Sequence, residues 1–127
     1  MLVFFRGRSI VEVVLEKQKK IKIMALEVTD GNYQELLSGD KLVVVDLWAE
    51  WCGSCKGMLP TIEELATEYE GKAIIGKCDT EENYDLTDNY KVRSLPTILF
   101  FKGGELIDKI VGSATKAELK EKIDANL

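Results

Sequence analysis

Two cysteines lie three residues apart in the segment Trp51-Cys52-Gly53-Ser54-Cys55-Lys56, which follows an apolar run and precedes a helical pattern. Paired thiols at a strand-to-helix junction can carry out a reaction that a single cysteine cannot: one attacks a disulfide, and the other releases the product. In the first turn of a helix the two Cα atoms lie about 5–6 Å apart, within the range that a disulfide requires. The spacing therefore predicts a pair that closes and reopens with little movement of the backbone.

A carboxyl group lies close to this pair in the sequence. Asp46 interrupts the apolar run Leu42–Trp48, with Val45 and Leu47 on either side. Burial raises the pKa of a carboxyl group because desolvation disfavours its charged form, and a raised pKa suits proton transfer near neutral pH. The alternative is an aspartate that faces solvent at a strand end, which the apolar neighbours make less favourable.

The numbers of cysteine and histidine residues limit the reactions and metal sites that are possible. The chain has three cysteines and no histidine, which excludes histidine general bases, Cys-His nucleophile pairs and histidine-containing zinc sites. Three cysteines are too few for a disulfide-rich secreted scaffold, and one must stay unpaired within the chain. A zinc site would need two ligands besides Cys52 and Cys55, so we expect no metal. The third cysteine, Cys78, is predicted to be a small buried hydrophobe, or a regulatory thiol if it is exposed.

Charge is distributed unevenly along the 127 residues, whose net charge is −5. Residues 1–23 hold six basic and two acidic side chains, so the remaining chain carries a net charge of −9. An acidic body argues against nucleic acid as a partner, because phosphate would be repelled. The apolar fraction of 46% is typical of a soluble globular protein, and the length fits a single core.

The first 23 residues differ from the rest. The apolar stretch Leu2–Phe5 is too short for a membrane span or for a signal-peptide core, so we expect no membrane insertion. We expect residues 1–23 to be a poorly ordered extension, or an over-called start with Met24 as the true initiator. A basic amphipathic arm that touches a membrane surface or an acidic partner is the open alternative.

Hydrophobic periodicity and turn signals predict the elements that must position the two thiols. Strands are predicted over Ala25–Val28, Lys41–Trp48, Ala73–Cys78, Thr97–Lys102 and Glu105–Val111, and Gly103-Gly104 is predicted to form the turn between the last two. Helices are predicted after a cap at Thr29 or Asp30, from Ser54 to Gly71 with a kink at Pro60, over Asn83–Tyr90, and after a cap at Thr115. Strands alternating with helices indicate an α/β fold with parallel pairs, and the final hairpin adds an antiparallel edge.

Together these residues resemble the thioredoxin family. The resemblance runs from about residue 24 to residue 127 and is carried by Asp46–Lys56, Pro60, Arg93-Ser94-Leu95-Pro96-Thr97, Phe101–Gly104, Gly112 and the C-terminal Asp124-Ala125-Asn126-Leu127. It implies the thioredoxin fold, a central mixed sheet with helices on both faces. Two departures are residues 1–23, which lie outside the pattern, and Ser54, which stands where the family usually has proline.

The resemblance also implies a dithiol–disulfide oxidoreductase. Cys52 would be the nucleophile, activated and open to solvent at a helix N-terminus. Cys55 would be the less exposed resolving thiol, and Asp46 would take its proton. Lys77 matches a family lysine that lies near this aspartate, although it could equally be an exposed strand-end charge.

A substrate-contact surface is implied as well. Pro96 resembles the family's cis-proline, whose preceding residue, Leu95, would pair with an extended substrate strand. Trp51 and Gly112 would complete an apolar rim around Cys52, together with Gly53 of the active-site loop. Ser54 supplies a donor that can bond the Cys52 sulfur.

The resemblance leads us to expect a cytoplasmic, monomeric protein-disulfide reductase. Its partners would be disulfide-containing proteins and a flavoenzyme of the thioredoxin reductase type, and it would need no cofactor besides its redox-active disulfide. Two alternatives stay open. A disulfide oxidant or isomerase usually carries histidine between its cysteines, and a non-catalytic binding module would use only the apolar rim.

Overall fold

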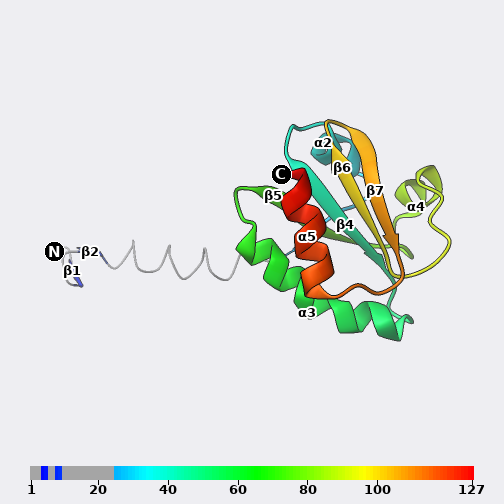
Figure 1. Cartoon of the computed structure of the whole chain (residues 1–127), viewed down its shortest axis with the longest axis horizontal. Helices are drawn as coiled ribbons and strands as arrows, with labels where there is room; N and C mark the ends of the chain where they lie inside the picture. Colours follow the sequence, from blue (N-terminus) through cyan, green and yellow to red (C-terminus); the bar gives the residue numbers. More distant parts are fainter. Residues whose placement is uncertain (1–3, 6–7, 10–24) are drawn as a thin grey trace.

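The computed structural model of the chain describes residues 4–5, 8–9 and 25–127 (Figure 1). Residues 25–127 form β3 (Leu26–Glu27), α2 (Tyr33–Leu37), β4 (Leu42–Trp48), α3 (Gly53–Glu68), β5 (Ala73–Asp79), α4 (Tyr84–Asn89), β6 (Thr97–Lys102), β7 (Glu105–Val111) and α5 (Lys116–Asn126). The predicted order of elements is confirmed. Farther upstream, β1 (Phe4–Phe5) pairs with β2 (Arg8–Ser9) in an antiparallel ribbon. Our expectation for residues 1–23 otherwise lies outside the described residues.

Five strands form one mixed sheet in the order β3-β5-β4-β6-β7. Strand β4 is central, parallel to β5 and antiparallel to β6, and β7 completes the predicted hairpin at one edge. Residues 42–47 of β4 are all buried because helices cover both faces of the sheet. The near-continuous apolar run of β4 predicted this central placement. The cysteines therefore follow the carboxyl end of the central strand.

Helices lie on both sides of the sheet (Figure 1), and two apolar clusters fill the space between the sheet and the helices. On one face, α3 and α5 pack through Met58, Ile62, Leu65, Leu119 and Ile123; on the other, α2 and α4 pack through Tyr33, Leu37 and Leu86. The expected sheet with helices on both faces is confirmed. The longest helix, α3, begins directly after Cys52, so its packing fixes the position of the cysteine pair.

The helix caps show where local sequence is a sufficient guide. Thr115 caps α5 as predicted, because its Oγ1 accepts a hydrogen bond from Glu118 N at 3.2 Å. The predicted cap of α2 at Thr29 or Asp30 is wrong, since the helix begins after Asn32. The Asp30 carboxylate instead accepts hydrogen bonds from backbone amides at the start of α4, including Leu86 N at 2.9 Å. The Asp30 side chain, which was expected to cap the adjacent helix, thus binds the amide of Leu86, 56 residues away.

Candidate active site

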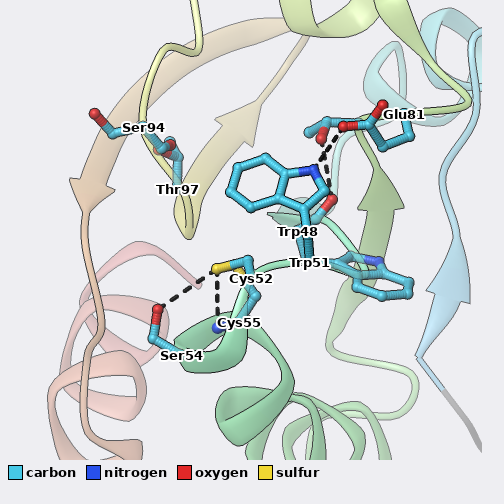
Figure 2. Close-up of a disulfide and its surroundings, with 9 residues drawn as sticks. Trp48, Trp51, Cys52, Ser54, Cys55, Glu81, Ser94 and Thr97 are labelled. Atoms are coloured by element: carbon cyan, nitrogen blue, oxygen red, sulfur yellow. Dashed lines mark hydrogen bonds between the residues drawn. A yellow bond between two sulfur atoms is a disulfide. The ribbon is translucent and has the colours of Figure 1, made fainter.

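Cys52 and Cys55 form a disulfide at the N-terminus of α3 (Figure 2). Their Cα atoms are 5.3 Å apart, as the helical spacing predicted. Cys52 is the N-cap residue, and its sulfur accepts a hydrogen bond from Cys55 N at 3.3 Å. This amide and the helix dipole both favour negative charge on the Cys52 sulfur, because they place positive potential at the start of the helix.

The two sulfurs differ in access, although less than expected. Cys55 is fully buried, whereas Cys52 keeps 7% of its surface exposed. Cys52 is more exposed than Cys55, as predicted. The expectation that Cys52 is open to solvent is wrong, because most of its surface is covered. Trp48 and Leu95 pack against the disulfide and cover much of it. Only this small exposed part of Cys52 is open to a molecule that approaches from solvent.

Two residues of the active-site loop lie beside the Cys52 sulfur. Ser54 is exposed, and its Oγ lies 3.5 Å from Cys52 Sγ (Figure 2). This is the contact expected of a hydroxyl at the position where the family usually has proline. Gly53 is exposed as well, and a Cβ added to it would meet no atom within 4 Å. The loop thus presents a small, polar surface next to the sulfur.

Asp46 is buried in the middle of β4, and neither carboxylate oxygen has a hydrogen-bond partner in the described chain. Burial raises the pKa of Asp46 from 3.8 to about 7, because the charged form loses its hydration, and the positive charge of Lys77 opposes this rise. A carboxyl group that titrates near neutral pH can accept a proton and give it up again under ordinary conditions.

Lys77 lies directly opposite Asp46 in the register of β4 and β5. Its ammonium group is bound elsewhere, 3.0 Å from Glu63 Oε1 and 3.8 Å from Glu27 Oε1. The Lys77 side chain is only 16% exposed, so it is not the exposed strand-end charge that the sequence left open. Its ion pair with Glu63 reduces the positive charge that Asp46 experiences.

Glu63 is a part of this group that sequence reasoning missed. It comes from α3, and its second carboxylate oxygen accepts a hydrogen bond from Ala25 N at 2.7 Å. The three charged groups come from three separate segments of the chain, β4, β5 and α3. No spacing rule links such segments, so only the packing of α3 against β5 reveals the contact.

Leu95, one of the expected rim residues, packs against the disulfide. Leu95 is half-buried against it, and the Leu95–Pro96 peptide bond is cis. Gly112 N donates a hydrogen bond to Pro96 O at 2.8 Å, and Gly112 has a φ of 99°, a conformation that favours glycine. No backbone hydrogen bond is formed by Leu95 within residues 25–127, so its peptide groups remain available to a bound chain.

Trp51 forms the outer part of the rim. The side chain is 71% exposed, and its indole N–H donates to Glu81 Oε1 at 2.7 Å (Figure 2). Trp51 and Leu95 line the same pocket of about 230 Å³. Glu81, which the sequence did not single out, therefore restricts the orientation of the exposed indole of the residue that precedes Cys52.

Cys78 is fully buried in β5. Burial raises the pKa of its thiol to about 12, and nearby carboxylates such as Asp30 contribute to this rise. The prediction of a small buried hydrophobe is confirmed. Within the described ranges, no group of three or more cysteine or acidic side chains could hold a metal ion.

The family model for thioredoxin matches residues 24–125. The chain belongs to the thioredoxin family. It is 48% identical over 102 residues to thioredoxin of Chlorobaculum thiosulfatiphilum, covering 80% of this chain and 94% of the relative. Thioredoxin 1 of Nostoc sp. is 41% identical over 104 residues, covering 81% of this chain and 97% of that protein.

A solved structure agrees with this assignment. A mutant thioredoxin from Halobacterium salinarum superposes with a TM-score of 0.76 at 31% identity, covering 82% of this chain and 91% of the other. The thioredoxin fold and its cysteine pair make this protein a thiol–disulfide oxidoreductase with dithiol–disulfide reductase activity. Thioredoxins act on disulfide substrates, are reduced by thioredoxin reductase and do not normally use a cofactor. Among the described residues, no helix is long and apolar enough to cross a bilayer.

Proposed function

We propose that this thioredoxin reduces disulfides in other proteins with Cys52 as nucleophile. The Cys52 thiolate attacks a substrate disulfide, forms a mixed disulfide and releases one substrate thiolate. The observation that carries this assignment is the position of Cys52 as the N-cap of α3, where the Cys55 amide contacts its sulfur. Cys55, buried behind it, has neither the access nor this contact.

Cys55 completes the exchange. Its thiolate attacks the Cys52 sulfur, the Cys52–Cys55 disulfide forms, and the second substrate thiolate leaves with a proton from solvent. Two electrons pass from the dithiol to the substrate. Asp46 takes the proton of Cys55, and its raised pKa supports this role. No hydrogen bond joins Asp46 to either sulfur in the described chain, so we assign this transfer to an intervening water.

Lys77 acts as a positioning residue for Asp46, because it contributes the positive charge that keeps the pKa of Asp46 from rising further. Leu95 and Pro96 form the substrate platform, on which an extended segment pairs with the Leu95 backbone. Trp51 and Gly112 flank that segment, while Gly53 and Ser54 lie beside the reacting sulfur.

In our proposal a flavoenzyme of the thioredoxin reductase type returns two electrons to the disulfide. The protein works as a monomer in the cytoplasm and needs no cofactor or metal beyond its two sulfurs. We assign this activity to residues 24–127, an assignment supported by the family match to residues 24–125. Residues 1–23 are an extension outside the catalytic domain, or precede its true start.

Insulin reduction with dithiothreitol as electron donor tests the proposal. The wild-type protein should reduce insulin, and Cys52→Ser should remove all turnover above the background of dithiothreitol alone. Turnover that survives in Cys52→Ser would refute the nucleophile assignment. Titration against a glutathione redox buffer separates a reductase from an oxidant, since a reductase keeps its disulfide intact until the buffer is strongly reducing.

A further inference from the structure

A second pocket of about 230 Å³ lies next to the Leu95–Pro96 loop, between the end of α4 and strand β7. We call it the basic pocket, because Lys91, Arg93 and Lys109 line it and no carboxylate does. Val92, Ser94, Thr97 and Val111 complete its lining, although Thr97 itself is buried. Val92 and Arg93 also line the pocket shared by Trp51 and Leu95, so the two pockets adjoin.

The three cations of the basic pocket are free to bind an anion. The ion pairs of residues 25–127 use Lys56, Lys77, Lys116, Lys120 and Lys122, and none uses a cation of the basic pocket. The nearest acidic neighbour in sequence, Asp108, already binds Lys122 Nζ at 2.6 Å and Lys109 N at 2.8 Å. The chain has a net charge of −5, but a pocket lined by three cations and no carboxylate has a positive potential that would attract negative charge.

The backbone at Lys91 gives a second, independent observation. Lys91 follows the C-cap residue Tyr90 of α4 and has a φ of 52°, the left-handed conformation that usually belongs to glycine at this position of a helix end. A side chain there costs about 1 kcal/mol that glycine would avoid. The conformation is the one that ends α4, where Val92 N donates a hydrogen bond to Thr87 O at 3.0 Å. In this protein it places a charged side chain in the basic pocket.

We propose that the basic pocket docks an acidic segment of the protein substrate, a few residues away from the disulfide that is being reduced. This inference rests on the substrate platform proposed for Leu95. A segment extended along Leu95 advances about 3.3 Å per residue, so one residue beyond Leu95 it meets the exposed Ser94, which lines the pocket. The Ser94 side chain points away from the disulfide in Figure 2, and Ser94 lines the basic pocket together with the three cations. Val111, 58% exposed, offers an apolar contact on the same path.

The experiment compares two peptides with the same intramolecular disulfide, one flanked by glutamates and one by glutamines. Each rate is divided by the rate with dithiothreitol alone, which corrects for intrinsic differences between the disulfides. We expect wild-type kcat/KM to favour the glutamate peptide by about fivefold at low salt, because exposed ion pairs are individually weak but add at one pocket. Raising the salt concentration should reduce this preference.

Three variants locate the effect. Lys91→Gln combined with Lys109→Gln should abolish the preference while the glutamine peptide reacts at the wild-type rate. Glutamate at both positions should favour a lysine-flanked peptide instead. Lys41→Gln combined with Lys72→Gln is the matched control, since both lysines are exposed and precede β4 and β5 at the opposite end of the sheet. This control should keep the preference.

Equal kcat/KM for both peptides in the wild-type protein would overturn the proposal, as would a preference that survives in the Lys91 and Lys109 variant. Inorganic phosphate at constant ionic strength should slow the glutamate peptide and leave the glutamine peptide unchanged; equal inhibition of both peptides would also overturn the proposal. If the proposed reductase function itself were wrong, the result would be distinguishable, because neither peptide would be reduced above the background of dithiothreitol.

Discussion

Asp46 and Lys77 lie opposite one another on adjacent strands, yet they are not hydrogen-bonded to each other. The Lys77 ammonium group binds Glu63 at 3.0 Å, which leaves the Asp46 carboxylate buried without a partner. A direct ion pair would hold the pKa of Asp46 low and make it a poor proton acceptor. The observed arrangement leaves the pKa of Asp46 at about 7, where the carboxyl group can exchange protons.

This burial makes stability depend on pH. The pKa of Asp46 is about 7 in the folded protein, against 3.8 for an ordinary aspartate, so between these values the folded state binds a proton that the unfolded chain releases. The contribution of Asp46 to stability is therefore complete below about pH 4 and is lost as the pH rises through 7. We expect Asp46→Asn to remove this loss, on the order of 2–4 kcal/mol. Urea unfolding at pH 5 and pH 8 measures it, and an identical pH dependence in the variant would contradict the assignment.

The same variant should slow catalysis. Without the carboxylate to which we assign the proton of Cys55, we expect resolution of the mixed disulfide at pH 7 to slow by on the order of 100-fold, a typical contribution of general base catalysis. The attack of Cys52 on the substrate should be much less affected. Rapid-quench measurement of the two steps separates them. An unchanged resolution rate in Asp46→Asn would show that Cys55 loses its proton to another group.

Glu63 should act on Asp46 through Lys77. We expect Glu63→Gln to lower the pKa of Asp46, because the freed ammonium group can then approach the carboxylate, and Lys77→Met to raise it. Gln retains an oxygen that can accept the hydrogen bond from Ala25 N. NMR titration of the Asp46 carboxyl carbon measures both shifts. Glu64→Gln is the matched control, since Glu64 is a neighbouring α3 carboxylate that pairs with Lys116 instead; an equal shift in this control would contradict the role of Glu63.

Ser54 should affect the redox equilibrium. Its hydroxyl lies 3.5 Å from the Cys52 sulfur, and a hydrogen bond to the thiolate would stabilise the reduced protein. We expect Ser54→Ala to raise the pKa of Cys52 and to make the reduction potential more negative by about 10–30 mV, which corresponds to roughly 0.5–1.4 kcal/mol. Equilibration with glutathione measures the potential. A less negative potential in the variant would show that loop rigidity outweighs this bond.

Cys78 should be unreactive toward thiol reagents in the folded protein. Burial raises the pKa of its thiol to about 12 and leaves no exposed surface, so almost no thiolate forms at pH 8. We expect iodoacetamide to modify reduced native protein at Cys52 and to spare Cys78, while Cys78→Ala keeps insulin reduction at the wild-type rate. Peptide mass mapping identifies the modified residue. Rapid modification of Cys78 would reveal access that the fold does not provide.

Much of the fold could be predicted from the sequence, because its signals are local. The apolar run of β4 and the Gly103-Gly104 turn specify their strands without help from distant residues, and the predicted bounds of β6 and β7 match the observed ones. Asp30 was misassigned as a helix cap because its hydrogen-bond donors lie in α4. Contacts between residues far apart in the sequence decide such cases, and no local pattern reports them.

The same limit applies to the candidate site. The cysteine spacing and the apolar neighbours of Asp46 predicted the disulfide and the buried carboxyl group, since both follow from adjacent residues. Glu63 and Glu81 were missed because each acts through a partner on another segment, Lys77 and Trp51 respectively. The degree to which Cys52 is covered was also missed, because Leu95 reaches it from a loop 43 residues away in the chain.

The central claim is that Cys52 is the sulfur that substrates meet first. Cys55→Ser cannot resolve a mixed disulfide, so this variant, incubated with insulin and without other reductant, should accumulate a covalent complex. Mass spectrometry of the digested complex should find insulin attached to Cys52 alone, and Cys52→Ser should form no comparable complex. Attachment of insulin through Cys78, or a complex that forms equally well in Cys52→Ser, would contradict the account.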